Sequence, residues 1–161
     1  MKTTKYLMMP ILSTTLLLTG CFFSSSSSTK TKTKFELEET FMFDDLELRF
    51  SSDYSFTKVE NQYSEYHEMD TVRLPVTVTN KDDETNGLNY FYITAYGPDG
   101  LEAKDVDAFF DDSILYSSNV LPGATYTTNL YFLYKGNGKY TIELHSFTSK
   151  KLQVIFDLVK R

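Results

Sequence analysis

The stretch Val72-Arg73-Leu74-Pro75-Val76-Thr77-Val78-Thr79 decides the fold class of this chain. Its apolar residues occupy every second position, and a period of two places one face of a β-strand against a core. Valine and threonine also favour strands, because their branched side chains fit a pleated surface. Pro75 has no N–H to donate to a sheet ladder, which favours an edge strand or a bulge at this point.

Similar alternation continues on both sides of this stretch. Strands are expected at 41–50, 54–59, 88–96, 101–106, 126–134, 140–145 and 152–158. The alternation within 41–50 breaks phase at Asp44-Asp45, which fits a turn or a bulge there. Turn signals separate the expected strands, and among them Gly136-Asn137-Gly138 predicts a tight hairpin. No segment has a long helical period, so the pattern predicts an all-β, antiparallel sandwich of about seven to nine strands. A closed barrel is the alternative.

The first twenty residues have the features of a secretory signal. Lys2 and Lys5 precede an apolar stretch at 6–18, which is shorter than the roughly 20 residues that a membrane-spanning helix needs. Leu18-Thr19-Gly20-Cys21 follows and resembles a bacterial lipobox, in which small residues fit a peptidase groove and the thiol takes a diacylglycerol. We therefore predict cleavage before Cys21 and a lipid anchor on its thiol, at the outer face of the cytoplasmic membrane. An ordinary cleavage site beside a free cysteine is the alternative.

A polar segment separates this cysteine from the alternating pattern. Residues 24–34 contain five consecutive serines and then alternating threonine and lysine, a composition that favours a flexible spacer because it has nothing apolar to bury. The predicted organisation is a lipoprotein signal peptide at 1–20, a lipidated cysteine and tether at 21–34, and one folded domain at 35–161. Lys30, Lys32 and Lys34 either bind anionic head groups or only keep the segment soluble.

Three short motifs in the domain resemble a known family. They are Leu74-Pro-Val-Thr-Val-Thr-Asn80, Pro98-Asp-Gly100, and Leu121-Pro-Gly-Ala124 leading into Tyr131-Phe-Leu133. Together they resemble an uncharacterised group of immunoglobulin-like lipoprotein domains from Gram-positive bacteria, whose members are often titled after telomeric repeat-binding factor. The resemblance covers about residues 40–160. It implies an immunoglobulin-like sandwich on an extracytoplasmic lipoprotein and supplies no catalytic residue.

Composition and motifs argue against several classes of function. The net charge of −6 argues against a nucleic-acid binder, and a single cysteine excludes an internal disulfide or a cysteine-based zinc cage. His67 and His145 lie in different segments, without the spacing of metal ligands. We find no nucleophile elbow, metalloprotease helix or phosphate-binding glycine loop. We therefore expect neither enzyme activity nor a cofactor, although scattered serine, histidine and aspartate leave a hydrolase open.

Acidic residues gather in one part of the domain. The candidates for a calcium site are Asp105, Asp107, Asp111 and Asp112. Calcium takes six to eight oxygen ligands, which such a cluster would help to supply. There is no EF-hand spacing, and a solvated acidic surface explains the same residues.

Aromatic residues on both faces of two predicted strands are the second functional signal. The outward-facing set is expected to be Tyr90, Tyr92 and Tyr131. Tyrosine is favoured at interfaces because it offers a large contact area at a small entropy cost. These rings therefore either form a partner-binding face or are covered by a loop such as 61–70, which holds Tyr63 and Tyr66.

The sequence as a whole predicts a lipid-anchored, extracytoplasmic binding module whose partner is an unknown protein or a cell-wall component. The alternatives are a structural component that maintains the envelope, and a surface-exclusion lipoprotein of a mobile element or phage.

Overall fold

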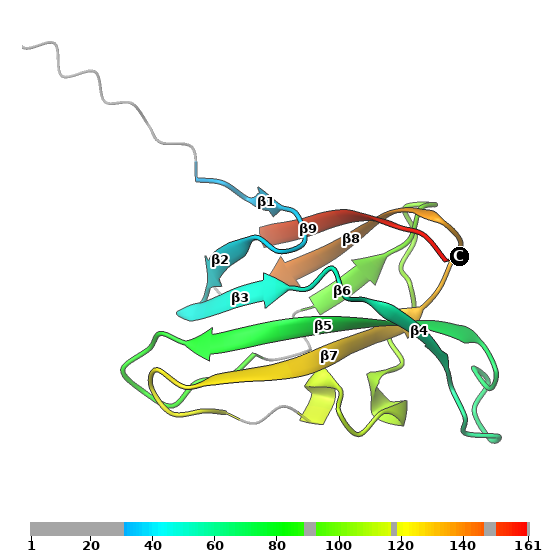
Figure 1. The fold of residues 1–161 in the computed structure, drawn as a ribbon, viewed down its shortest axis with the longest axis horizontal. Coiled ribbons are helices and arrows are strands. Elements are labelled where there is room, and N and C mark those ends of the chain that lie inside the picture. Colours follow the sequence, from blue (N-terminus) through cyan, green and yellow to red (C-terminus); the bar gives the residue numbers. More distant parts are fainter. Residues whose placement is uncertain (1–30, 89–92, 117–118, 147–150, 161) are drawn as a thin grey trace, which may run out of the picture. The chain divides into compact units, whose positions relative to one another are not determined.

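The computed structural model describes residues 31–88, 93–116, 119–146 and 151–160. Within these ranges the chain forms nine strands and two short 3₁₀ helices (Figure 1). The strands are β1 (Lys34–Phe35), β2 (Thr40–Phe43), β3 (Leu46–Phe50), β4 (Ser55–Lys58), β5 (Asp70–Asn80), β6 (Ile93–Tyr96), β7 (Thr125–Leu133), β8 (Gly138–His145) and β9 (Lys151–Leu158). The 3₁₀ helices are η2 (Asp107–Phe109) and η3 (Ile114–Tyr116).

The strands form two sheets, so the predicted sandwich is confirmed and the barrel alternative is wrong. Sheet A has the order β1-β9-β8-β6. Sheet B has the order β2-β3-β5-β4, with β7 paired to β5 on its other side. All of these pairs are antiparallel except that of β1 with β9, which is parallel.

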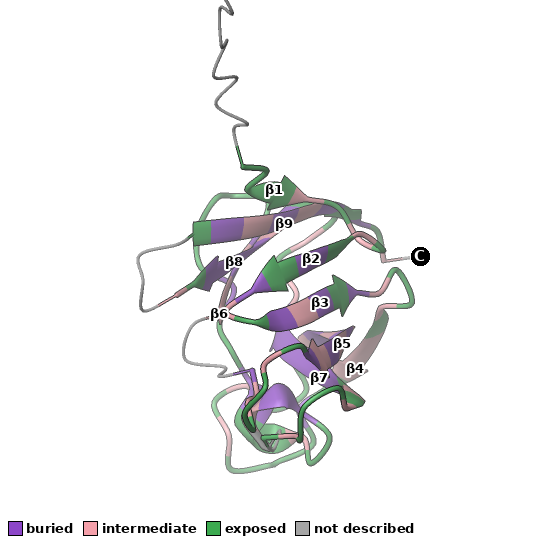
Figure 2. Ribbon diagram, turned by 90° about the vertical axis from the view of Figure 1, so that its left-hand side faces the viewer, coloured by how far each residue is buried: buried purple, intermediate pink, exposed green. Residues whose placement is uncertain are grey.

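The core lies between the two sheets, where the predicted alternation places its apolar residues (Figure 2). On β5 the inward residues are Val72, Leu74, Val76 and Val78, and each has no exposed surface. The same core contains Tyr140, Ile142 and Leu144 of β8 and Leu152, Val154, Phe156 and Leu158 of β9. The period of two therefore identified the buried face of each of these strands correctly.

The break in phase at Asp44-Asp45 is a two-residue hairpin turn between β2 and β3. Both aspartates have positive φ, 47° and 61°, as a turn that matches the twist of a hairpin requires. Phe43 pairs directly with Leu46 across the turn. This register returns the apolar residues of both strands to the core face, so the turn, rather than a bulge, accounts for the break.

Pro75 lies in a central strand, and the prediction of an edge strand or a bulge is wrong. β5 pairs with β7 along one side and with β3 and then β4 along the other. Pro75 falls in the gap between the part of β5 that pairs with β3 and the part that pairs with β4. Its carbonyl accepts the N–H of Ser51 at 2.9 Å. The N and C=O of one strand residue point to the same side, so the missing N–H faces this break in the ladder.

The predicted hairpin at 136–138 is also wrong, because β7 and β8 belong to different sheets. The connection between them crosses the end of the sandwich. The hydroxyl of Tyr140 accepts the N–H of Lys135 at 2.8 Å and donates to the carbonyl of Gly136 at 3.0 Å. A tyrosine that bonds back to the preceding connection is a feature of immunoglobulin-like sandwiches.

Residues 101–106 do not form the predicted strand but cross from one sheet to the other. Ala103 donates its N–H to Ala95 of β6 at 2.8 Å, and Lys104 accepts the N–H of Leu133 of β7 at 2.9 Å. This segment therefore pairs with an edge strand of each sheet, and a covered edge is protected against pairing with another chain.

The folded part of the chain begins earlier than the predicted boundary at residue 35. Thr33 accepts the N–H of Gln153 at 2.9 Å, and Lys34 already belongs to β1. The last residues of the predicted tether are therefore part of sheet A. The predicted signal peptide, Cys21 and the tether as far as residue 30 lie outside the described residues.

Candidate functional site

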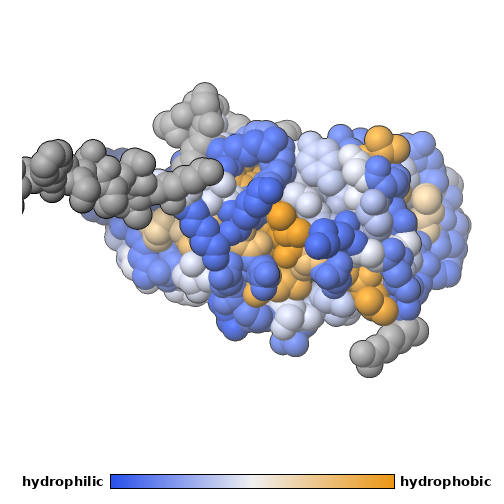
Figure 3. Space-filling view, turned by 90° about the horizontal axis from the view of Figure 1, so that it is seen from above, coloured by the Kyte–Doolittle hydropathy of each residue, from blue (hydrophilic) through white to orange (hydrophobic). Residues whose placement is uncertain are grey.

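A groove with a volume of about 780 Å³ lies where β1 meets β9. Its lining comes from β1 and the turn after it, from the β3–β4 connection, and from β8 and β9. Phe35, Leu37, Tyr54, Ile155 and Phe156 form its apolar part. Figure 3 shows apolar surface gathered on the face that carries β1 and β9, with hydrophilic side chains on both sides of it.

The length of β1 explains why the groove exists. β1 has two residues whereas β9 has eight, because the chain turns away from β9 after Phe35 and crosses to sheet B. Glu38 takes a positive φ of 69° in this turn and donates its N–H to Phe50 of β3 at 2.8 Å. The groove is the space left open beside the second half of β9.

The aromatic lining of the groove is held in place by the core. The ring of Phe35 stacks on Phe41 with centroids 4.3 Å apart, and the ring of Tyr54 meets Phe56 edge-on at 6.1 Å. Phe156 has core contacts as well, because its ring lies 6.1 Å from that of Tyr140. Rings that are packed in this way give a preformed surface, which is typical of ligand pockets.

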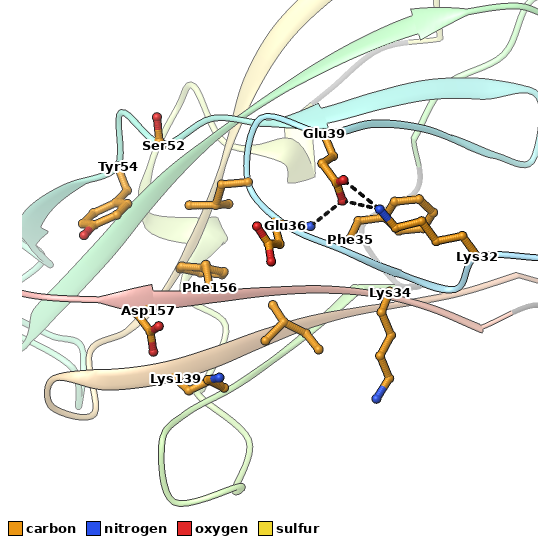
Figure 4. A pocket seen from close by; sticks show the side chains of 12 residues that line it. Lys32, Lys34, Phe35, Glu36, Glu39, Ser52, Tyr54, Lys139, Phe156 and Asp157 are labelled. Carbon is orange, nitrogen blue, oxygen red and sulfur yellow. Dashed lines mark hydrogen bonds and ion pairs between the residues drawn. The ribbon is translucent and has the colours of Figure 1, made fainter.

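The rim of the groove is charged and partly paired (Figure 4). Lys32 bonds both carboxylate oxygens of Glu39 at 2.7 and 2.8 Å, and its ammonium lies 5.1 Å from the centre of the Phe35 ring. The hydrogen bond from Lys32 holds the pKa of Glu39 below its ordinary value. Lys34, Lys139, Glu36 and Asp157 complete the charged lining. An apolar floor with a mixed polar rim suits a ligand that has both apolar and polar parts.

Tyr131 does not belong to a free partner-binding face, so that prediction is wrong. Only 3% of its surface is exposed. Its ring stacks on Phe110 with centroids 3.9 Å apart, and its hydroxyl donates to Asp112 at 2.7 Å and accepts from Arg73 at 3.0 Å. Burial, followed by the bond to Asp112, raises the pKa of Tyr131 to about 12. A covered ring is the alternative that the sequence left open, and it is confirmed here.

The cover over Tyr131 differs from the one expected. Residues 106–112 provide most of it, and Tyr66 of the predicted loop packs against the same small cluster. Tyr90 and Tyr92, the other two members of the expected face, lie outside the described residues.

The four acidic calcium candidates do not converge, and three of them have separate roles in this cover. Asp107 is buried and accepts the N–H of Tyr131 at 2.9 Å, while Asp105 accepts the N–H of Asp107 at 2.7 Å. Asp112 is held by Tyr131, by Arg73 at 3.0 Å and by Asn129 at 2.9 Å, and Asp111 is exposed. In the described part of the chain, no three histidine, cysteine, aspartate or glutamate side chains are grouped so as to hold a metal.

Sequence reasoning missed Glu143, which is 5% exposed although it lies on the outer face of sheet A. Its carboxylate bonds Lys151 at 2.7 Å, His145 at 2.6 Å and Gln153 at 3.0 Å. Burial alone would raise the pKa of Glu143, but these hydrogen bonds outweigh it and lower the pKa. The pairing of β8 with β9, which sets Glu143 opposite Gln153, is the signal that would have revealed this cluster.

Known proteins resemble this chain in fold and not in sequence. Neither a family model nor a curated protein matches the sequence, so the predicted family resemblance stays a prediction. Within the described residues, no helix is both long enough and apolar enough to cross a membrane.

Three solved structures have similar folds. The "putative lipoprotein (ycdA)" of Bacillus subtilis has a TM-score of 0.58 at 17% identity, over 80% of this chain and 39% of that chain. The yjhA protein of the same organism has a TM-score of 0.57 at 14% identity, over 76% of this chain and 99% of that one. The secreted protein MPT63 of Mycobacterium tuberculosis has a TM-score of 0.54 at 14% identity, over 81% of this chain and 100% of that one. At these identities the likeness shows a shared β-sandwich fold.

Proposed function

We propose that this chain is a lipid-anchored, non-catalytic binding module on the outer face of the cytoplasmic membrane, and that it captures its partner in the groove beside β9. The observation that carries this proposal is the groove itself. Its volume of about 780 Å³ and its core-held aromatic lining have the dimensions and chemistry of a binding pocket.

The anchor rests on the position of the single cysteine. Cys21 follows Leu18-Thr19-Gly20 at the end of a short apolar segment, and a protein of similar fold from Bacillus subtilis carries the name "putative lipoprotein (ycdA)". Ten Cα–Cα steps lead from Cys21 to Thr31, so a fully extended connection would reach about 35 Å. A lipid on Cys21 would therefore keep the groove within a short distance of the membrane surface.

The anchor is tested with Cys21→Ser in a bacterial host. Wild type should fractionate with membranes and incorporate a palmitate analogue, because two or more acyl chains hold a protein stably in a bilayer. Cys21→Ser should incorporate none. Equal labelling of the two proteins would refute lipidation at this residue.

The groove is tested by filling it. Ser52 is an exposed lining residue whose side chain bonds Glu38 at the surface, so Ser52→Trp would place a large ring in the opening at little cost to the fold. Asp83→Trp, at an exposed position that does not line the groove, is the matched control. When membranes are treated with a cross-linker, the partner should be captured by Asp83→Trp and not by Ser52→Trp. Retention of the partner by Ser52→Trp would refute binding in the groove.

A further inference from the structure

Half of the outer edge of β9 has no partner strand. β9 spans Lys151–Leu158, but β1 pairs with it only at Gln153 and Val154 (Figure 1). In the described part of the chain, no other segment makes a backbone hydrogen bond with this edge beyond β1. The groove lies along the same stretch, since its lining includes Ile155 and Asp157.

The direction of the free backbone groups follows from β1. Gln153 donates its N–H across this edge to Thr33 at 2.9 Å. Backbone groups alternate between the two sides of a strand, so Ile155 and Asp157 also turn their N–H and C=O to this edge, away from β8. Beyond the end of β1, the C=O of Ile155 and the N–H of Asp157 therefore face the groove as an acceptor and a donor with strand spacing.

The side chains around these groups fit a strand as well. The side chain of Phe156 points inward, and those of its two neighbours point outward. A residue placed opposite Phe156 in an added strand would turn its side chain toward Leu37 and Tyr54, which line the apolar part of the groove. Its neighbours in the added strand would point to solvent.

We propose that the groove accepts an extended polypeptide segment, which adds a short strand to sheet A beside residues 155–157. This inference rests on the proposed binding function and names the chemistry of the partner. The segment carries an apolar residue at its centre and polar residues beside it. Its backbone would bond Ile155 and Asp157, as peptides do when they extend the edge of a sheet.

The closed ends of the groove favour a single extended segment over a second copy of this chain. Phe35 closes one end, and at the other end Val159 donates its N–H to the Tyr54 hydroxyl at 3.4 Å. The open edge between them has room for about four residues at 3.3 Å each. The β9 edge of a second copy carries its own β1 and its own crossing turn, so a single extended segment suits this opening better.

The probe for this proposal is a fluorescent six-residue peptide in which valine alternates with threonine over four residues between terminal lysines. It is added to the full-length chain in detergent micelles. Binding is measured by anisotropy, and the exchange of the Asp157 amide proton is measured by NMR. The peptide should bind and should slow this exchange by at least about tenfold, because the proton becomes part of a ladder hydrogen bond. No binding at millimolar peptide, or binding without protection of Asp157, would overturn the proposal.

Two variants and one modified peptide isolate the backbone bonds. Asp157→Pro removes the N–H that faces the groove and leaves the bonds to β8. Asp83→Asn, which removes one negative charge at an exposed position outside the groove, is the control. Peptide affinity should fall by about tenfold or more in Asp157→Pro and stay unchanged in Asp83→Asn. A peptide with N-methylated amides should not bind wild type, which keeps the test decisive if Asp157→Pro fails to fold. Equal affinity of wild type for the plain and methylated peptides would overturn the proposal.

Ser52→Trp and Asp157→Pro together distinguish a failure of this inference from a failure of the proposed function. If Ser52→Trp loses its cellular partner while Asp157→Pro keeps it, the groove binds a partner that is not an added strand. If both variants keep the partner, the groove is not the binding site.

Discussion

Replacing Asp107 with asparagine should stabilise the fold at neutral pH. Asp107 is 1% exposed, and in the described structure its Oδ2 atom has no hydrogen-bond partner. Burial, together with the nearby carboxylate of Asp105, raises the pKa of Asp107 from its ordinary value of 3.8 to about 9. At pH 7 the folded protein therefore holds a proton on this carboxyl, and the unfolded chain has released it.

The size of the effect follows from the two pKa values. The contribution of Asp107 to stability is complete below pH 3.8 and is lost as the pH rises toward 9, because the folded state then binds more protons than the unfolded state. At about 1.4 kcal/mol per pH unit, the loss at pH 7 is at most about 4 kcal/mol. Asparagine carries no charge and its side-chain oxygen can still accept the N–H of Tyr131, so Asp107→Asn should recover most of this loss.

The assay is denaturant unfolding of wild type and Asp107→Asn at each pH unit from 5 to 8. The gain in the free energy of unfolding should increase with pH. Asp111→Asn, which changes an exposed acid in the same segment, is the matched control and should give no such trend. Parallel pH curves for wild type and Asp107→Asn would refute the assignment of a buried, protonated carboxyl.

Two further substitutions test the packing. Tyr131→Phe removes a hydroxyl that makes two side-chain hydrogen bonds and should lower the free energy of unfolding by about 1–3 kcal/mol. An unchanged melting temperature would mean that the cover does not depend on this hydroxyl. Gly138→Ala should cost about 1–3 kcal/mol, because a Cβ there would lie 2.9 Å from Cβ of Pro98 at a φ of 143°. Gly123→Ala, at a φ of 75° in open space, should cost less stability than Gly138→Ala. Equal losses of stability in the two variants would mean that the contact with Pro98 contributes nothing.

Much of the fold could be predicted because each strand carries its own signal. The alternation along β5, β8 and β9 depends only on which residues face the core, and the structure buries those residues. The choice of which strands pair, in contrast, depends on residues that are far apart in the sequence. Gly136-Asn137-Gly138 has the composition of a hairpin turn, yet it connects two sheets, because β7 pairs with β5 over nine positions.

The candidate site could not be predicted for a related reason. Tyr131 alternates as an outward residue and does lie on the outer face of sheet B, but the segment that holds Phe110 and Asp112 folds over it. The groove depends on the point at which the chain leaves β9 after Phe35. Sequence alternation gives no information on where two strands separate.

The most direct test of binding in the groove is site-specific photo-crosslinking in living cells. A photoreactive amino acid replaces Ser52, which lines the groove, or Asp83, which does not, in the full-length chain. We predict a discrete crosslinked partner from position 52 and none from position 83. Failure to obtain a crosslinked product from position 52, or the same products from both positions, would contradict the account.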